Sequence, residues 1–250
     1  MNKKWLNIAS GVTGLALLLL FWWVITLNNS GLMERFKPDA AFISLWQLLH
    51  GAELQLHIEV SLLRVAIGLF FALLIGVPIG LLTGYFQRLE ALTSPAFQFL
   101  RMISPLSWMP LAVMIWGVGD RPIWFLLTFA AVWPIIISTA SGVRQIDRGW
   151  LALVHSLSAT RLETLYHIIL PAIISPVLTG IRLAIGILWI VLVPCEMLGV
   201  NAGLGYFILD TRDRLAYSEL MATILLIGIL GFLMDYLARL PARYWAARHG

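Results

Sequence analysis

Long apolar segments separated by short polar ones dominate the pattern along this chain. A helix that crosses a bilayer needs roughly 20 apolar residues, because the hydrocarbon core is about 30 Å thick and each residue rises about 1.5 Å. Windows of this length predict six transmembrane helices. Their approximate bounds are Ile8–Leu27, Ser61–Phe86, Pro95–Val118, Ile123–Val143, Ala172–Leu198 and Glu219–Leu240. Polar connections are expected between them, with Asn28–Glu59 the long one and Gln87–Ser94 a short turn.

Composition supports this all-α membrane fold. The 250 residues are 60% hydrophobic and 12% charged, with a mean hydropathy of +0.88. Soluble domains contain about 25% charged residues, so a soluble protein is excluded. The net charge of +4 indicates membrane orientation and no nucleic-acid partner. Cys195 is the only cysteine, which excludes a disulfide framework and a multi-cysteine metal site.

The distribution of basic residues predicts the topology. Lys and Arg are more frequent in the segments that would lie inside if the N-terminus is cytoplasmic, so both termini are expected in the cytoplasm. No small-x-small cleavage site follows Leu27, so the first span is expected to remain uncleaved. We predict a single transmembrane domain over residues 1–250, with a core region at 61–240.

A polar island, Arg144–Pro171, interrupts the apolar spans and would face the cytoplasm. Asp147 can cap a first short helix, and Thr160 with Glu163 forms a capping box for a second. Pro171 would then permit a change of direction into the next span. Apolar side chains gather on the first helix: Trp150, Leu151, Leu153, Val154 and Leu157. Such a helix either docks a partner or lies on the lipid headgroups.

Two prolines interrupt the third predicted span. Pro105 and Pro110 each remove a backbone donor and weaken the helix. Broken helices at membrane depth line cavities or are buried in protein. Because Ser104, Ser107 and Trp108 place polar and aromatic groups at this break, we favour a solute path over a packing kink.

Charged residues inside the predicted spans are further candidates. Arg182 and Glu196 lie 14 positions apart, about 21 Å along a helix, so they cannot pair within one span. Each needs another partner, and either a transport role or a structural ion pair satisfies that need. Arg64 is expected to extend to the outer interface. Asp235 can pair with Arg239 four residues on and is assigned no transport role.

Other patterns limit the function classes. Gly76, Gly80 and Gly84 permit close helix approach, either within the core or at a dimer seam. No G-x-x-x-x-G-K-[ST] loop is present, so the chain cannot bind ATP in that way. The histidines are expected in loops, scattered on both sides, which argues against a metal site and an intramembrane serine protease.

The island resembles the cytoplasmic loop of permease subunits of ATP-binding-cassette (ABC) importers. That loop has the pattern E-A-A, three residues, G, nine residues, I-x-L-P. Ile168, Leu170 and Pro171 match it, while Ser158 replaces the glycine and Ala152-Leu153-Val154 replaces E-A-A. The resemblance implies a coupling helix that fits a groove on an ATPase subunit. Residues assigned to docking are Trp150, Leu151, Leu153, Val154, Leu157, Ser158 and Ala159.

Further motifs extend the resemblance from about Ser61 to Met234, closest to the nitrate/sulfonate/taurine/bicarbonate branch. Three stretches are similar to that branch's P-x-x-P-L-A-W-x-P-L, F-G-I-G-E and G-L-R-L … W … A-E … G-L-G patterns. They are Ser104–Leu111, Trp116–Asp120 and Gly180–Gly205, the last with Arg182, Trp189, Glu196 and Gly203-Leu204-Gly205 in order.

The resemblance implies a type I ABC importer permease fold, a multi-pass location in a bacterial inner membrane, and a transport role without enzyme activity. ATP–Mg would bind a separate ATPase subunit, a periplasmic binding protein would deliver a small, anionic solute, and the chain would form a homodimer in the lipid bilayer. No cofactor is expected on this chain. The alternative is an ATP-independent channel or facilitator with an interfacial cytoplasmic helix. Residues assigned to the path and gate are Ser104, Pro105, Ser107, Trp108, Pro110, Arg182 and Glu196.

Overall fold

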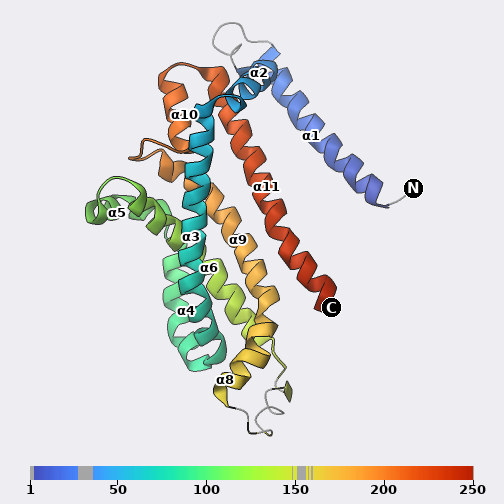
Figure 1. Cartoon of the computed structure of the whole chain (residues 1–250), viewed down its shortest axis with the longest axis vertical. Coiled ribbons are helices and arrows are strands. Elements are labelled where there is room, and N and C mark those ends of the chain that lie inside the picture. The colour runs from blue at the N-terminus through green and yellow to red at the C-terminus, as the bar shows by residue number, and fades with distance from the viewer. Residues whose placement is uncertain are drawn as a thin grey trace.

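The computed structural model describes residues 3–27, 36–147, 149, 150, 156, 158 and 160–249, with side chains left out at a few further positions. The predicted docking residues Leu151, Leu153, Val154, Leu157 and Ala159 lie outside this described part. Throughout the described ranges the regular structure is helical (Figure 1).

The helices follow one another with short connections. They are α1 Lys3–Leu27, α2 Pro38–Leu49, α3 Ala52–Tyr85, α4 Gln87–Met102, η2 Pro105–Trp108, α5 Met109–Trp116, α6 Asp120–Arg144, α8 Arg161–Thr164, η3 Leu165–Ile169, α9 Leu170–Glu196, α10 Leu204–Asp213 and α11 Tyr217–His249.

Four helical stretches in the described residues are long and apolar enough to cross a membrane. They are Ala52–Tyr85, Asp120–Arg144, Leu162–Glu196 and Tyr217–Ala242. A bent pair made of α4 and Pro105–Trp116 could add a fifth, and α1 contains a shorter apolar stretch, Ser10–Thr26. The chain is therefore an all-α, multi-pass membrane protein, as predicted. The total of six spans and the cytoplasmic location of both termini remain predictions.

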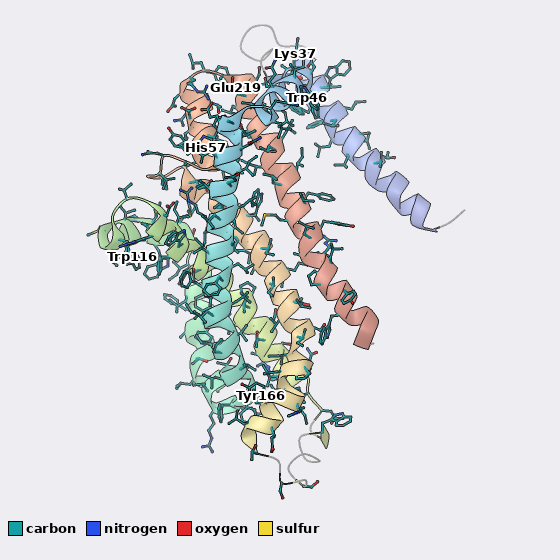
Figure 2. The ribbon with its side chains drawn as sticks, viewed as in Figure 1. Lys37, Trp46, His57, Trp116, Tyr166 and Glu219 are labelled. Atoms are coloured by element: carbon teal, nitrogen blue, oxygen red, sulfur yellow. The ribbon has the colours of Figure 1, made fainter. Side chains whose placement is uncertain are left out.

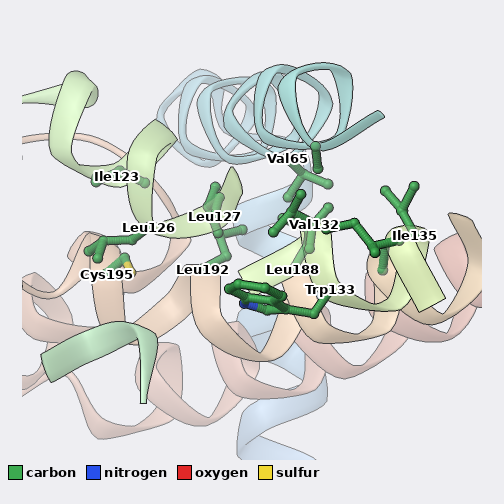
Figure 3. Close-up of a cluster of buried hydrophobic side chains, with 14 of the residues drawn as sticks. Val65, Ile123, Leu126, Leu127, Val132, Trp133, Ile135, Leu188, Leu192 and Cys195 are labelled. Atoms are coloured by element: carbon green, nitrogen blue, oxygen red, sulfur yellow. The ribbon is translucent and has the colours of Figure 1, made fainter. Parts of the chain in front are cut away.

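Helix α6 forms the centre of the bundle. It packs against α3 on one side and α9 on the other. In its apolar stretch 61% of the residues are buried, against 28% or less in the other three spans, so α6 is the most enclosed of these four helices. Figure 3 shows the core between these helices, where Val65 of α3, Leu127 of α6 and Leu188 of α9 are fully or almost fully buried.

The glycines of α3 explain how closely α3 and α6 approach. A Cβ on Gly76 would lie 2.8 Å from Ile135, and one on Gly80 would lie 2.6 Å from Thr139. Gly84 faces α6 one turn further on, at Ala140 and Val143. The small-xxx-small pattern therefore serves core packing, and α6 occupies the face that a dimer seam would have needed.

The third predicted span is not a single helix. Helix α4 and the η2–α5 segment are bent by 86° relative to each other, and α5 projects from the bundle (Figure 1). The expected polar turn Gln87–Ser94 is instead the first half of α4. A hydropathy window missed it because α4 is amphipathic, with polar residues at helical spacing on one face.

The described end of the island is helical up to the membrane span. Thr160 and Glu163 form the predicted capping box: the Thr160 backbone N–H donates to the Glu163 carboxylate at 2.7 Å. A π-helical turn, Leu165–Ile169, precedes Pro171, and the helix continues to Glu196 without a break. The change of direction expected at Pro171 is therefore not seen: Pro171 falls in the first turn of α9, where proline is tolerated, and the helix runs on through it. Exposed aromatic residues lie near both ends of the molecule, Trp46 at one and Tyr166 at the other (Figure 2).

Candidate functional site

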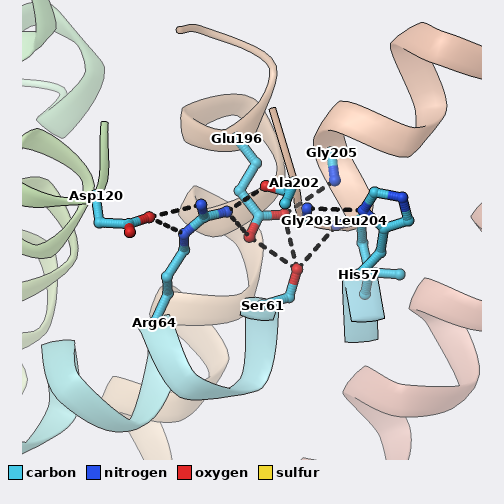
Figure 4. Close-up of polar contacts among 9 residues, drawn as sticks. All are labelled: His57, Ser61, Arg64, Asp120, Glu196, Ala202, Gly203, Leu204 and Gly205. Atoms are coloured by element: carbon cyan, nitrogen blue, oxygen red, sulfur yellow. Dashed lines mark hydrogen bonds and ion pairs between the residues drawn. The ribbon is translucent and has the colours of Figure 1, made fainter. Parts of the chain in front are cut away.

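A buried ion pair joins two helices that are distant in sequence. The Arg64 guanidinium, on α3, donates to the Glu196 carboxylate, at the end of α9, over 2.8 Å. Arg64 is 4% exposed and Glu196 is fully buried. Arg64 also donates to Asp120 at the start of α6, over 2.6 and 2.9 Å, and to the carbonyl of Ala202 over 2.6 Å. One guanidinium thus connects α3, α6, α9 and the loop before α10 (Figure 4).

The Glu196 carboxylate also holds the start of α10. It accepts from the Gly205 backbone N–H at 2.9 Å and from the Ser61 hydroxyl at 2.8 Å. Ser61 in turn accepts from the Leu204 N–H at 2.9 Å. The first backbone N–H groups of a helix lack partners within the helix and carry partial positive charge, so a carboxylate there is stabilising.

Steric contacts with this cluster explain why the Gly203-Leu204-Gly205 motif contains two glycines. Gly203 has a φ of +122°, and a Cβ there would lie 2.5 Å from the Glu196 carboxyl carbon. A Cβ on Gly205 would lie 2.3 Å from the Val193 carbonyl oxygen. Only glycine lets the chain approach the carboxylate this closely.

Two sequence expectations about this region were wrong. Arg64 does not extend to the interface, because Glu196, Asp120 and Ala202 offer it acceptors inside the protein. His57 lies in α3, not in a loop, and is 5% exposed. Its Nδ1 accepts from the Gly203 N–H at 3.0 Å, which adds a fourth contact to the start of α10.

Arg182 lies away from this cluster. Its Nε donates to Asp235 of α11 at 3.1 Å, and Asp235 also binds Arg239, the pair predicted at i,i+4 spacing. Both members of the Arg182–Asp235 pair are about 40% exposed, unlike the Arg64–Glu196 pair. Arg182 and Glu196 thus find separate partners, as their spacing required.

The predicted break at the prolines is real, but it has a different form. Pro105 begins the 3₁₀ turn η2 and Pro110 falls in the first turn of α5. Proline lacks a backbone N–H, but in the first turn of a helix that group has no partner within the helix. Neither proline therefore removes a helical hydrogen bond at these positions. Ser104 precedes η2, and Ser104 and Ser107 are exposed. Trp108 packs against Phe129 with ring centroids 5.7 Å apart, and its buried indole N–H lacks an acceptor.

Two cavities lie beside α6, one toward α4 and one toward α9. The first, of about 300 Å³, is lined by polar residues of α4 that include Thr93, Ser94 and Gln98. The second, of about 380 Å³, is lined mainly by apolar residues, among them Phe129 of α6 and Ile187 of α9. Among the predicted path residues, Pro105 lines the second cavity, while Arg182 and Glu196 line neither.

Arg101 and Trp133 line both cavities, and sequence reasoning missed them. Arg101 lies in the last turn of α4, just before the bend. The sequence does contain a pattern that points to Arg101. Polar residues recur at spacings of three and four, which places them on one helical face: Glu90, Ser94, Gln98 and Arg101. This face was overlooked because Gln87–Ser94 was predicted to be a turn.

In the polar island the structure describes part of the predicted docking set. Trp150 is helical and 60% exposed. Ser158 has a φ of +56°, the left-handed region that favours glycine, and it stands where the resembled loop has glycine. A glycine would adopt this backbone conformation without the strain that serine incurs.

Comparison with known proteins identifies the family. Residues 76–245 match the family "Binding-protein-dependent transport system inner membrane component". This match covers more than half of the chain, and the chain belongs to that family. This family is that of transport permease subunits, which are not themselves enzymes. The predicted resemblance to ABC importer permeases is confirmed.

Several named relatives are similar to the chain. The bicarbonate transport system permease protein CmpB of Synechococcus elongatus is 38% identical over 70% of this chain and 63% of its own length. The taurine transport system permease protein TauC of Escherichia coli is 29% identical over 94% of this chain and 88% of its own length. The putative aliphatic sulfonates transport permease protein SsuC of Bacillus subtilis is 31% identical over 91% and 83%.

The chain therefore matches less than two thirds of the length of CmpB. Among solved structures, an inward-facing form of the MetNI methionine ABC transporter contains a chain with the same fold. The TM-score is 0.61 at 17% identity, over 74% of this chain and 92% of that one.

Proposed function

We propose that this chain is the transmembrane permease subunit of an ATP-driven importer that passes a small anionic solute across the inner membrane. The family match over residues 76–245 carries this proposal. Relatives whose names refer to bicarbonate, nitrate, taurine and aliphatic sulfonates support an anionic solute. The solute would come from a periplasmic binding protein, and ATP–Mg would bind a separate ATPase subunit.

A route for coupling ATP hydrolysis to the path supports the same proposal. Helical structure runs unbroken from Leu162, beside the cytoplasmic loop, to Glu196 in the buried polar cluster. If the ATPase displaced the loop, the movement would be transmitted along this helix. It would then change the Arg64–Glu196 contacts at the other end of the helix. Because those contacts join four elements, they can switch as a unit between inward- and outward-facing arrangements.

A homodimer is part of the proposal. Helix α5 projects from the bundle (Figure 1) and exposes Met114 at 83% and Ile115 at 60%. A projecting arm with an apolar surface suits contact with a second copy, which would close the open side of the cavities. The path and gate would then include Ser104, Pro105, Ser107, Trp108 and Pro110, together with Arg182 and Glu196.

Co-purification with the ATPase subunit tests the docking part directly. The full chain in detergent should retain an ATPase subunit, and deletion of residues 151–157 should release it and stop ATP-dependent uptake. Thr13→Ala, in the separate helix α1, is a control that should leave both unchanged. Retention of no ATPase by the intact chain, together with unaltered uptake after the deletion, would instead support a facilitator with a lipid-lying loop.

A further inference from the structure

Arg101 is a cation without a counter-ion at the boundary between the two cavities. Within the part of the chain that the structure describes, it forms no ion pair, whereas Arg64, Arg144 and Arg182 each have a carboxylate partner. Counting from Gln87, Arg101 lies about 21 Å along α4. Its side chain is exposed and lines both cavities, so the guanidinium is accessible to a ligand there. In a chain that crosses the membrane, a charged residue without a counter-ion beside a cavity is a candidate for the solute pathway.

The surroundings of Arg101 carry a net positive charge. The polar cavity holds three charged side chains, Glu90, Arg101 and Arg144. Glu90 and Arg144 neutralise each other in an ion pair, which leaves the Arg101 charge uncompensated. Arg101 lies in the last turn of α4, where the helix dipole favours a positive charge but supplies no counter-ion.

A second donor without a partner lines the same two cavities. Trp133 is 9% exposed, and its indole N–H has no acceptor in the structure. The ring packs between Phe97 and Phe129, with centroid distances of 5.7 and 5.4 Å. Buried donors usually find an acceptor, so an unsatisfied one beside a cavity indicates a group that a ligand could supply.

The two cavities differ in character on either side of Arg101. Hydroxyl and amide groups from Thr93, Ser94 and Gln98 line the first. The second is lined by apolar groups, including Phe129, Leu183 and Ile187. A charged group at the junction of a polar and an apolar cavity suits a ligand that has one ionic end and one apolar end.

We propose that Arg101 binds the negatively charged head group of a small organic anion while the apolar part of that anion occupies the 380 Å³ cavity. The head group would accept hydrogen bonds from the guanidinium fork, with Gln98 and Trp133 as neighbouring donors. This assignment rests on the proposed function, because it places the transported solute in the path of the importer. It favours an alkanesulfonate-like solute over an inorganic oxyanion such as nitrate.

Ligand-induced stabilisation of the assembled permease–ATPase complex tests the assignment. The complex is titrated with 1-butanesulfonate, with nitrate and with 1-butanol at constant ionic strength, and the midpoint of thermal unfolding is followed. Butanesulfonate should raise the midpoint, and nitrate and butanol should do so much less. Arg101→Gln should weaken the apparent affinity for butanesulfonate on the order of tenfold or more, since a charge-assisted hydrogen bond is lost.

Arg88→Gln is the matched control. Arg88 is an exposed arginine at the other end of the same helix and lines neither cavity, so this variant should titrate like the wild type. Arg101→Lys keeps the charge and should retain part of the affinity, which guards against a folding defect in Arg101→Gln.

Equal affinities in Arg101→Gln and Arg88→Gln would overturn the proposal. Equal stabilisation by nitrate would overturn the assignment to an organic anion, and equal stabilisation by butanol would overturn the role of charge. A wild-type chain that forms no complex with an ATPase would instead contradict the proposed function itself, so the two failures are distinguishable.

Discussion

The Arg64 guanidinium lies 2.8 Å from the Glu196 carboxylate, although 132 positions separate the two residues in the chain. Both side chains are buried, and each has further partners that fix its position. Removing one member of such a pair leaves an uncompensated charge inside the protein, whereas removing both does not. This asymmetry gives the first prediction.

Arg64→Met should destabilise the protein by about 3–5 kcal/mol, because Glu196 is left buried without its cation. Glu196→Gln should be destabilising for the converse reason. The double variant Arg64→Met/Glu196→Gln should lose less than the sum of the two single losses. Unfolding midpoints of the four proteins in one detergent form the double-mutant cycle. Strict additivity would show that the ion pair contributes nothing beyond its separate members.

The glycines before and at the start of α10 give a steric prediction. Gly203→Ala and Gly205→Ala should each destabilise by on the order of 1–3 kcal/mol, because their Cβ atoms would lie 2.5 Å from the Glu196 carboxyl carbon and 2.3 Å from the Val193 oxygen. Gly186→Ala is the control, since a Cβ there has no neighbour within 4 Å. Thermal unfolding of the three variants compares them, and a loss in Gly186→Ala equal to the others would rule out the steric explanation.

Variants of Arg182 and Asp235 can distinguish a role of Arg182 in the solute path from a purely structural role of the ion pair. Asp235 binds both Arg182 and Arg239, so these three side chains carry a net positive charge in the bilayer region. We expect Arg182→Met to abolish uptake of an anionic solute without loss of protein level, and Asp235→Asn to retain uptake. Uptake by the importer in proteoliposomes, normalised to protein, makes the comparison. Parallel losses of protein level in both variants would mean that the pair is structural.

Ser158 offers a test of the loop geometry. Its φ of +56° costs a non-glycine residue about 1–2 kcal/mol relative to glycine. Ser158→Gly should therefore keep or strengthen ATPase binding, whereas Ser158→Val should weaken it, because a β-branched residue avoids this conformation. Co-purification of the ATPase subunit at increasing salt ranks the variants. If Ser158→Gly bound the ATPase more weakly than Ser158→Val, ATPase binding would not require the left-handed backbone conformation at position 158.

Local patterns predicted much of the molecule correctly. Apolar windows located the long helices α3, α6, α9 and α11, because lipid imposes a minimum length on any helix that crosses it. The Thr160–Glu163 capping box was readable because its partners are three residues apart. The amphipathic helix α4 was missed in its first half because one polar face lowers the average hydropathy of a helix whose other face is apolar.

The sequence by itself therefore determined the membrane class, the family and the presence of intramembrane charges, all of which depend on composition and short-range spacing. Only the tertiary structure decided which groups those charges meet. Arg64 is buried because α6, α9 and the loop before α10 bring acceptors to it, and Arg101 lies at a cavity junction because α4 bends by 86° from the segment after it. Helical periodicity specifies a face of one helix, but which helices pack against that face is set by close contacts such as that of Gly80 with Thr139. Such contacts join positions far apart in the chain, so no local pattern records them.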